Sequence, residues 1–250
     1  MILKDIGMVA APSLRSKAYI QALVNHKLYP SYVILLEDNY SSCKPEHLLI
    51  DNAGFYSSKQ KKHVFNQLNN PYFKYDENMV ETLKTHDVSF EVCRHTDINS
   101  KEFIQVLKNR PESFFIYSGY GGTILRKDVL SCGKRFIHIH SGKLPEYKGS
   151  TTIYYSILNE GQCFATVFFI DEQIDHGEII KIKKYPMPTD GENIDYVYDS
   201  YIRSDALVET IKEYAKQNHF VSCPQKGESE IFYIIHPILK HIAIISCKQK

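Results

Sequence analysis

The chain has 250 residues, of which 30 are Lys or Arg and 29 are Asp or Glu, so its formal net charge is +1. This length is enough for one sizeable domain, or for one domain with a small appendage, and it allows a full hydrophobic core. A net charge close to zero excludes a strong overall field that would gather nucleic acid or an acidic membrane. We therefore expect a small-molecule substrate.

The cysteine pattern indicates a reducing compartment. Six cysteines are scattered along the chain without a CxxC pair, and the N-terminal residues lack the charged and then apolar pattern of a signal peptide. No apolar run approaches the ~18 residues that suggest a membrane span. These features predict a soluble, cytoplasmic protein with free thiols.

The N-terminal half predicts alternating strands and helices. An apolar strand at 6–11 is followed by apolar residues at helical spacing from Leu14 to Leu23, and then by a second apolar strand, Tyr32–Leu36. The polar segment Glu37–Tyr75 predicts loops and one or two helices. Further on we expect a helix at Met79–Thr85, a strand at Val88–Val92, a helix carrying Phe103, Val106 and Leu107, and a strand at Phe114–Tyr117. Such alternation is typical of a parallel α/β sheet.

The second half predicts shorter elements and a long helix. After a glycine-rich turn we expect a helical piece to Leu130, strands at Arg135–His140, Phe164–Ile170 and Glu178–Lys183, and a helix at Ile194–Lys216. The tail has apolar runs at Ile231–Ile235 and Ile242–Ile245, which predict an extended segment or small hairpin, as an appendage or a homodimer contact. We expect residues 1–185 to form a catalytic domain and residues 186–250 a C-terminal helix and β extension packed on it.

Two histidines share one face of a predicted strand. In the segment 136–140, apolar residues alternate with His138 and His140, so both imidazoles point to the same side. The strand ends at the loop 141–149, which contains two glycines and a proline. Open α/β sheets bind ligands beyond the carboxyl ends of their strands. We therefore expect His140 at the mouth of a ligand-binding crevice.

An acidic turn follows the next predicted strand. The segment 171–177 reads Asp-Glu-Gln-Ile-Asp-His-Gly and lies between two expected strands. A turn of this kind can return the Asp175 carboxylate to the imidazole of His140.

These segments together resemble the catalytic core of the folate-dependent formyltransferases. The family pattern is roughly Asn-x-His, then Pro or Ser, two further residues and Leu-Pro-x-Tyr-Arg-Gly, followed later by an acidic loop ending Asp-x-Gly. Here the first part spans His138–Gly149 and the second is Asp175–Gly177, while Tyr120–Leu125 resembles the family's folate loop. The resemblance implies an α/β fold with a doubly wound, mostly parallel sheet, that is, a formyltransferase-like Rossmann-type core, and a small C-terminal extension.

The resemblance also implies a reaction and roles. An amine attacks the formyl carbon of N10-formyltetrahydrofolate; His140 would stabilise the negative charge on the carbonyl oxygen, and Asp175 would assist proton removal and orient the imidazole. His138 replaces the family's asparagine, which donates a hydrogen bond to the formyl oxygen, with a larger group that titrates near neutral pH. The folate cofactor is expected at Tyr120, Gly121, Gly122, Ile124, Leu125, Ile170 and Ile174.

Within the family, the nucleotide-sugar N-formyltransferases resemble the chain most. A methionyl-tRNA formyltransferase is expected to have a further C-terminal domain and a basic surface for tRNA. The glycinamide ribonucleotide enzyme is expected to have a glycine-rich phosphate loop, and none is visible at Val9–Ser16. The expected partner is therefore a nucleotide-linked amino sugar, without nucleic acid or membrane. Its expected ligands are Lys143, Tyr147, Lys148, Ser150, Thr151 and Thr152.

Other interpretations of the same residues remain open. His138 and His140, joined by Asp175 or His176, would also suit Zn²⁺ and the activation of a water for hydrolysis. Metal binding does not require the segment Leu144–Gly149, and the preferred interpretation contains no metal. A formyltetrahydrofolate hydrolase would release formate without an amine acceptor, and a non-catalytic protein would keep the fold alone.

Overall fold

Strands and helices alternate through the first part of the chain, as the apolar pattern predicts. The computed structural model describes residues 1–36, 74, 77–188 and 194–248. The segment Glu37–Tyr75, expected to hold loops and one or two helices, lies outside the described residues except for Lys74. The chain divides into two compact units, residues 1–123 with 132–134, and residues 124–131 with 135–250. The chain passes from one unit to the other within residues 123–135, whereas the sequence predicted a division after residue 185. The division after residue 185 stays a prediction.

The first unit contains four parallel strands, β1 (Ile2–Ala10), β2 (Tyr29–Leu36), β3 (Phe90–Cys93) and β4 (Phe114–Ser118), in the order β3-β2-β1-β4. Met8 at the centre pairs with Val33 on one side and Ile116 on the other. All three are fully buried. Consecutive apolar residues are required here because both faces of such strands are covered.

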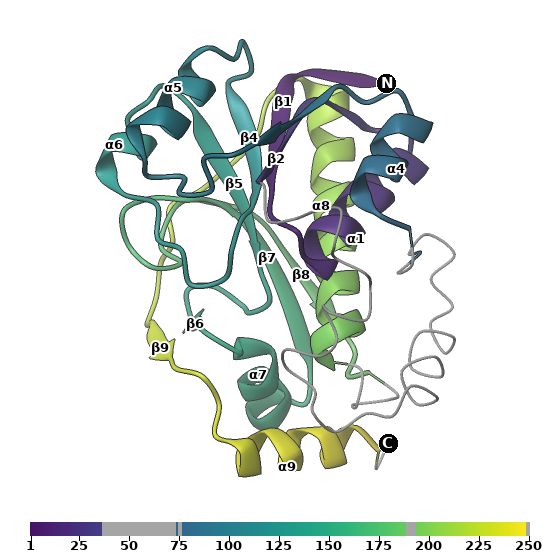
Figure 1. Cartoon of the computed structure of the whole chain (residues 1–250). Coiled ribbons are helices and arrows are strands. Elements are labelled where there is room, and N and C mark those ends of the chain that lie inside the picture. The colour runs from purple at the N-terminus through teal and green to yellow at the C-terminus, as the bar shows by residue number, and fades with distance from the viewer. Residues whose placement is uncertain (37–73, 75–76, 189–193, 249–250) are drawn as a thin grey trace. The chain divides into compact units, whose positions relative to one another are not determined.

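The helices of this unit begin at polar side chains that cap them. These helices are α1 (Leu14–Asn25), α4 (Met79–Thr85) and α5 (Lys101–Lys108). The hydroxyls of Ser13 and Ser100 accept hydrogen bonds from the first turns of α1 and α5. Asn78 and Glu81 form a capping box at the start of α4. The three helices expected from sequence are thus confirmed, and α1 and α4 pack together (Figure 1).

The second unit contains an antiparallel sheet that the sequence pattern did not indicate. Its strands are β5 (Arg135–His140), β7 (Cys163–Phe169) and β8 (Ile179–Tyr185), in the order β5-β7-β8. His140 pairs with Thr166 and Ile137 with Phe169. Every residue of β7 is buried, so its sequence reads like a parallel strand. Apolar runs of this kind do not report strand direction.

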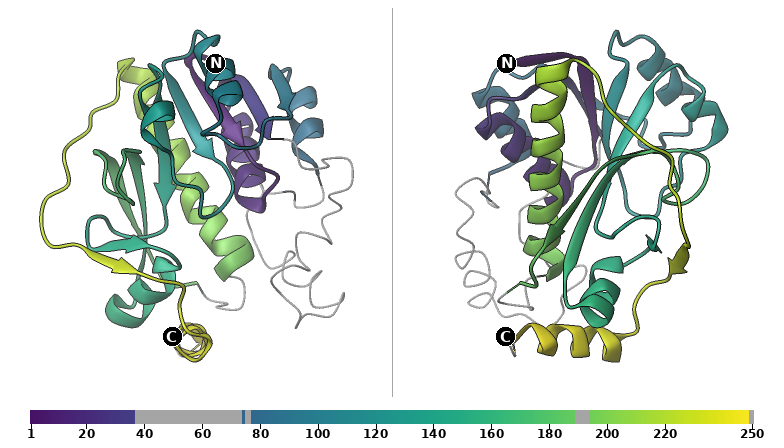
Figure 2. Two further views of the ribbon diagram at one scale, coloured as in Figure 1. Left: turned by 60° about the vertical axis from the view of Figure 1, so that its left-hand side comes forward. Right: turned by 180° about the vertical axis from the view of Figure 1, so that it is seen from behind.

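One long helix covers this sheet. A short π-helical segment (Ile194–Tyr198) leads into α8 (Asp199–Gln217), which packs on β5, β7 and β8 (Figure 2). Its buried stripe includes Ile202, Leu207 and Ile211, as the helical spacing predicts. Partly buried lysines of β8 pair with acidic residues of α8: Lys181 with Glu209 and Glu213, and Lys183 with Asp205 and Glu209.

The remaining elements connect these strands and form the tail. They are α6 (Lys127–Leu130), β6 (Tyr147–Gly149), α7 (Thr152–Glu160), β9 (Glu230–Phe232) and α9 (Pro237–Lys248). β9 pairs in parallel with β6, so an extended segment is confirmed near 231–235. The strand or hairpin expected at Ile242–Ile245 is wrong, because these residues lie in α9. Ala243 and Cys247 are buried and lie four residues apart, which places them on one face of a helix. The helix α9 packs on α7 (Figure 1).

The predicted α/β class with a parallel core is confirmed. Parallel pairing holds throughout the described strands of the first unit, and the antiparallel strands belong to the second. Among the helices that the structure describes, none combines the length and the apolar composition needed to cross a membrane.

Candidate active site

His140 is the last residue of β5, and only 4% of it is exposed. Its Nε2 atom lies 2.7 Å from the carbonyl oxygen of Tyr147. Because a carbonyl oxygen can only accept a hydrogen bond, Nε2 holds the proton and donates it. Nδ1 is the nitrogen left for chemistry, and it lies 3.5 Å from Oδ2 of Asp175.

The surroundings of His140 favour its neutral form. Burial lowers the pKa of the imidazole below its ordinary value of 6.5. The Asp175 carboxylate opposes this shift, while the Arg203 guanidinium adds to it. The net direction of the pKa is downward. At neutral pH the ring is therefore uncharged, with its proton on Nε2 and a lone pair on Nδ1 beside Asp175.

Asp175 is held in a tight turn between β7 and β8. Its Oδ2 accepts a hydrogen bond of 2.8 Å from the N–H of Gly149. Its φ is +46°, in the left-handed region that Asp adopts more readily than most residues. A Cβ atom on Gly177 would lie 1.8 Å from the carbonyl oxygen of Phe169, so this position needs glycine. The Asp-x-Gly sequence thus builds the turn that brings Asp175 to His140.

A side chain from the C-terminal segment holds the same turn. Cys223 exchanges backbone hydrogen bonds of 2.8 and 2.9 Å with Ile179 at the start of β8. Gln225 then donates from Nε2 to the carbonyl oxygens of Asp175 and Gly177, each at 3.0 Å. Its Oε1 is buried and has no hydrogen-bond partner in the described part of the chain. Gln225 therefore fixes the peptide groups that follow Asp175 and Gly177.

The turn after β5 leaves no room beside the imidazole. A Cβ atom on Gly142 would lie 2.6 Å from Nε2 of His140 and 2.9 Å from the Tyr147 carbonyl oxygen. The buried hydroxyl of Thr166 donates to the carbonyl of Gly142 at 2.6 Å and accepts from the N–H of Leu144 at 3.2 Å. The first glycine of the motif is thus required by close approach, and Thr166 secures the loop from β7.

Arg203 reaches this turn from α8. Its guanidinium donates to the carbonyl oxygen of Ile139 and, at 2.7 Å, to the hydroxyl of Ser141. These residues lie on either side of His140. Its Nε donates to Asp199, one helical turn earlier, at 2.8 Å. The planar guanidinium presents its donors in a fixed fork, so a single side chain fixes both flanks of the imidazole.

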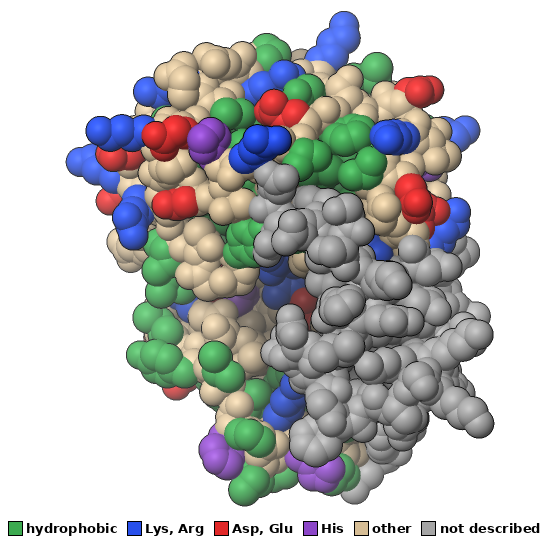
Figure 3. Space-filling model, in the orientation of Figure 1, with side chains coloured by type: hydrophobic (Ala, Val, Ile, Leu, Met, Phe, Trp, Pro, Cys, Tyr) green, Lys and Arg blue, Asp and Glu red, His purple; other side chains and the backbone are tan. Residues whose placement is uncertain are grey.

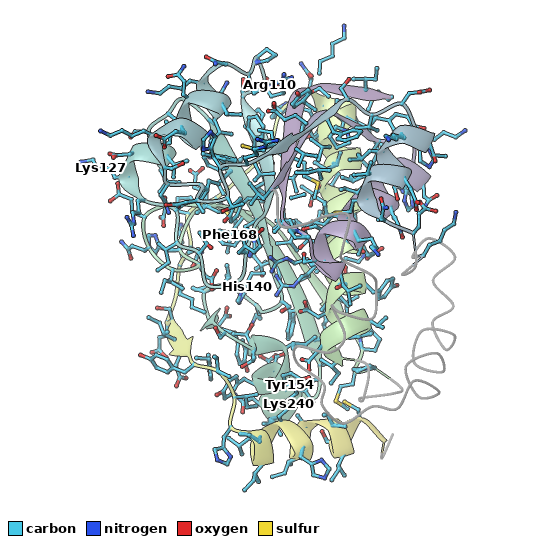
Figure 4. All side chains as sticks on the ribbon, viewed as in Figure 1. Arg110, Lys127, His140, Tyr154, Phe168 and Lys240 are labelled. Atoms are coloured by element: carbon cyan, nitrogen blue, oxygen red, sulfur yellow. The ribbon has the colours of Figure 1, made fainter. Side chains whose placement is uncertain are left out.

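His138 lies two residues before His140 on the same strand and is half-buried. Its ring makes an edge-to-face contact with Phe168 on β7, with centroids 5.8 Å apart. Figure 4 labels His140 and Phe168 on these two strands. The alternation along a strand places both histidines on one face, as predicted.

The two lysines expected to bind a substrate differ in their surroundings. Lys143 forms an ion pair with Glu146 at 2.8 Å, and this hydrogen bond raises the pKa of the lysine. Lys148 on β6 is buried, and no carboxylate among the described residues lies within ion-pair distance of it. A lysine ammonium without a counter-ion is available to an anionic ligand as a point charge. The role of both lysines stays a prediction.

The other residues expected to bind a substrate largely have partners within the protein. Tyr147 is buried and its ring stacks on an aromatic ring of β9. The hydroxyl of Thr152 donates to the Ser141 carbonyl at 2.8 Å and lies 3.2 Å from Nε2 of His140. The hydroxyl of Thr151 accepts a backbone N–H of the C-terminal segment at 2.9 Å. Ser150 is exposed. Their contacts with a substrate stay predictions.

The residues expected to bind the folate are divided between the two units. Tyr120, Gly121 and Gly122 belong to the first unit, whereas Ile124, Leu125, Ile170 and Ile174 belong to the second. Gly122 has φ +77°, a conformation that strains any residue with a side chain. Leu125 is buried, whereas Ile124 and Ile174 are about half exposed, at 54% and 47%. Exposed isoleucines offer apolar surface to a ring-shaped ligand, and this role stays a prediction.

The described residues offer no set of side chains that could bind the zinc ion of the alternative interpretation. Within them, no group of three or more His, Cys, Asp or Glu side chains is placed to hold a metal ion. His176, a proposed third ligand, instead pairs through Nδ1 with Asp171 at 2.6 Å.

Sequence reasoning missed the residues that hold the histidine and the aspartate in place. Arg203 and Asp199 are four residues apart on a predicted helix, a spacing that signals an ion pair but not its contact with β5. Thr166 lies within the apolar strand β7, so the sequence did not indicate that its hydroxyl bonds the loop after β5. Gln225 lies in an irregular segment and gave no sequence signal.

Curated relatives of the chain include methionyl-tRNA formyltransferases. That of Roseiflexus sp. (strain RS-1) is 34% identical over 98 residues, which cover 38% of this chain and 30% of the relative. That of Finegoldia magna is 23% identical over 168 residues, covering 66% of this chain and 53% of the relative. The chain thus spans about half the length of these relatives or less.

Solved structures with a similar fold include sugar N-formyltransferases. One from Shewanella sp. FDAARGOS_354 has a TM-score of 0.57 at 13% identity and covers 97% of this chain and 87% of its own. The N-formyltransferase from Helicobacter canadensis was solved with folinic acid and dTDP-3-aminofucose. It has a TM-score of 0.53 at 16% identity, and the match covers 93% of this chain and 71% of that enzyme. At such identities the similarity establishes the fold.

The family itself is established by a longer match. A model of the family described as formyl transferase matches residues 35–205, which is more than half of the chain. The match includes both histidines, the motif loop and the turn with Asp175. The chain belongs to the formyl transferase family.

Proposed function

We propose that the protein transfers a formyl group from N10-formyltetrahydrofolate to the amine of a nucleotide-linked amino deoxysugar. The observation that supports this most directly is the distance of 3.5 Å between Nδ1 of His140 and Oδ2 of Asp175, inside a motif of this family. A base and a carboxylate in contact are what the attack of an amine on a formyl group requires.

The reaction replaces one carbon–nitrogen bond with another. The amine nitrogen attacks the formyl carbon, and the carbonyl oxygen becomes negatively charged. The amine then loses a proton, the bond from carbon to N10 breaks, and N10 takes up a proton to leave as tetrahydrofolate. Nδ1 of His140 has a lone pair and accepts the amine proton. Asp175 stabilises the imidazolium that forms, and the hydrogen bond from Nε2 to the Tyr147 carbonyl oxygen holds the ring in place.

This division of roles differs from the one expected from sequence. His140 was expected to stabilise the oxyanion, but in the neutral form its single N–H is already donated to Tyr147. The oxyanion donor is then His138, which occupies the position of the family's asparagine. A neutral imidazole has one N–H that can donate to the developing charge.

N10-formyltetrahydrofolate is the formyl donor in this proposal. The structurally similar Helicobacter canadensis enzyme binds folinic acid, a formylated tetrahydrofolate. In this chain the half-exposed Ile124 and Ile174 supply apolar surface. Flat heterocycles bind to such surfaces through burial of apolar area.

A sugar nucleotide is the proposed acceptor. Lys148 lacks a carboxylate partner among the described residues, so a diphosphate would compensate the charge of its ammonium group. The Helicobacter canadensis structure contains dTDP-3-aminofucose. Methionyl-tRNA is the second candidate, because the curated relatives act on it by name. The net charge of +1 argues against a long phosphate backbone as substrate.

Mass spectrometry of products tests both candidates. The purified protein is offered N10-formyltetrahydrofolate with a panel of nucleotide-linked amino sugars and, separately, with methionyl-tRNA. We expect one formyl group to be added to at least one sugar. Formylated methionyl-tRNA alone would move the assignment to the second candidate. Formate release without acceptor would identify a hydrolase, and no product at all would contradict the proposed function.

We also propose that two copies associate through the C-terminal region. Exposed apolar residues run from β9 into α9, with exposures from 40% to 80%: Ile231, Tyr233, Ile234, Ile238, Leu239, Ile242 and Ile245. Figure 3 shows hydrophobic side chains along this edge. A continuous apolar strip can meet the same strip of a second copy about a twofold axis. Light scattering should give the mass of a dimer for the wild type and the mass of a monomer for Ile242→Lys. Gln217→Lys, the control variant, should remain a dimer. A monomeric wild type would contradict the proposed association.

A further inference from the structure

Arg203 lies outside the family motif, yet it holds the motif strand at its functional end. Its side chain is 12% exposed. It comes from α8, more than 60 residues further along the chain, and donates to the Ile139 carbonyl and the Ser141 hydroxyl. Those two groups precede and follow His140 directly.

We infer that Arg203 is a positioning residue for formyl transfer: it fixes the backbone on both sides of His140 and thereby the direction in which Nδ1 faces Asp175. This inference rests on the proposed function. Nδ1 of His140 and Oδ2 of Asp175 lie 3.5 Å apart, whereas Arg203 donates its hydrogen bonds to the end of the strand. It acts through the strand end, and Asp199 holds its guanidinium in the required orientation at 2.8 Å.

The geometry separates this role from that of an ordinary surface ion pair. An exposed pair on one helix, four residues apart, contributes little to stability and needs no third partner. Here the guanidinium has two further acceptors on β5 and the turn after it, and both side chains of the pair are largely buried. Only a planar fork of donors spans these acceptors together.

Charges face His140 from two sides. The Asp175 carboxylate approaches from the turn between β7 and β8, and Arg203 and Asp199 approach from α8. β6 and α7 contribute a backbone carbonyl and a hydroxyl, which are uncharged. The cation of the α8 pair lowers the pKa of the imidazole and the anion raises it. Removal of one member of the pair should therefore shift this pKa in a direction that depends on which member is lost.

Two variants with opposite expected signs test the inference. The titration of His140 is followed by long-range ¹H–¹⁵N NMR in the protein without substrates. We expect Arg203→Gln to raise the pKa of His140, and Asp199→Asn to lower it, each by about half a unit or more. In the same variants kcat should fall ~10–100-fold, with KM for both substrates nearly unchanged, because no substrate contact is lost. The acidic limb of the kcat profile should move with the NMR value.

Matched controls come from an ion pair that α8 forms with β8. Lys181→Gln and Glu213→Gln remove the same charges from a pair between β8 and α8 that does not contact β5. Neither should change the titration of His140. Arg203→Lys keeps the charge but not the fork, so we expect a pKa close to wild type together with a lower kcat. If Arg203→Gln does not fold, Asp199→Asn and Arg203→Lys still decide the outcome.

The result that overturns the inference is a titration of His140 that neither variant alters, together with a kcat within twofold of wild type. A wild-type protein without formyl transfer would contradict the proposed function instead. In that case the NMR titrations still show whether Arg203 controls His140.

Discussion

Nε2 of His140 donates a hydrogen bond of 2.7 Å to the carbonyl oxygen of Tyr147. This bond commits one nitrogen of the imidazole to the protein's own backbone. The other nitrogen, beside Asp175, is consequently the only one that can exchange a proton with a substrate, and the predictions below follow from that assignment.

The pH dependence distinguishes the two possible roles of His140. Because burial lowers its pKa, the imidazole is neutral at pH 7 and becomes protonated only below its ordinary value of 6.5. A base must be unprotonated, so kcat/KM should be constant near neutral pH and fall towards acid, with an apparent pKa below 6.5. Stopped assays from about pH 4 to about pH 9 measure this profile. Activity that rises towards acid would instead support the imidazolium as oxyanion donor.

Removal of either partner should abolish turnover. We expect His140→Ala and Asp175→Asn each to lower kcat by ~10²–10⁴-fold, because the proton acceptor or its stabilising charge is lost. Asn tolerates the left-handed φ of +46° at this position, so the turn should persist. Asp128→Asn, on the exposed surface of α6, is the matched control. Wild-type turnover in either active-site variant would rule out the assignment.

His138 should be replaceable by the residue that the family has there. An asparagine amide can donate the same hydrogen bond, so His138→Asn should keep kcat within about tenfold of wild type. His138→Phe has no donor and should lower kcat by ~10²–10³-fold. Steady-state kinetics of the two variants measure the difference. Complete loss in His138→Asn would show that the histidine has a role that an amide cannot fill.

Gly142 should not accept even a methyl group. Its added Cβ would lie 2.6 Å from Nε2 of His140, so Gly142→Ala must displace the ring or the loop. We expect a large fall in kcat with a loss of stability of about 1–3 kcal/mol. Far-UV circular dichroism and thermal unfolding separate the two effects. An active, unchanged Gly142→Ala variant would mean that the loop relaxes without moving the imidazole.

Gln225 should matter more for activity than for stability. Gln225→Leu removes both hydrogen bonds to the turn that holds Asp175, so kcat should fall ~10-fold or more. The free energy of unfolding should change by only about 1–2 kcal/mol, because the lost bonds are partly replaced by water. Gln217→Leu, at the exposed end of α8, is the control. Equal kinetics for the two variants would exclude a role for Gln225.

The elements that could be predicted from the sequence are those with a periodic apolar pattern and those that belong to a family motif. The buried strands β1, β2 and β4 and the capped helices α1 and α5 follow from apolar periodicity and from serine caps. The strand with both histidines and the turn with Asp175 also follow, because they are local. Strand direction in the second unit could not be predicted, since β7 is buried on both faces and reads the same whether it runs parallel or antiparallel.

The parts of the site that escaped prediction depend on long-range contacts. Arg203 and Gln225 act on backbone and side-chain groups that precede them by 48 to 64 residues. Nothing in their own surroundings in the sequence indicates such contacts. The tautomer of His140 likewise depends on a carbonyl seven residues away that folds back on the ring. Apolar runs such as Ile242–Ile245 are ambiguous because strand and helix bury them equally well.

The backbone bridge between Ile179 and Cys223 also sets the order in which this site can form on a ribosome. Gln225 follows Asp175 by 50 residues, and at ~5–20 residues per second its synthesis lags by roughly 3–10 s. During that interval the nascent chain can already pair β5, β7 and β8, while the turn with Asp175 lacks the side chain that holds it. The two hydrogen bonds from Gln225 to this turn can therefore form only after residue 225 has been synthesised.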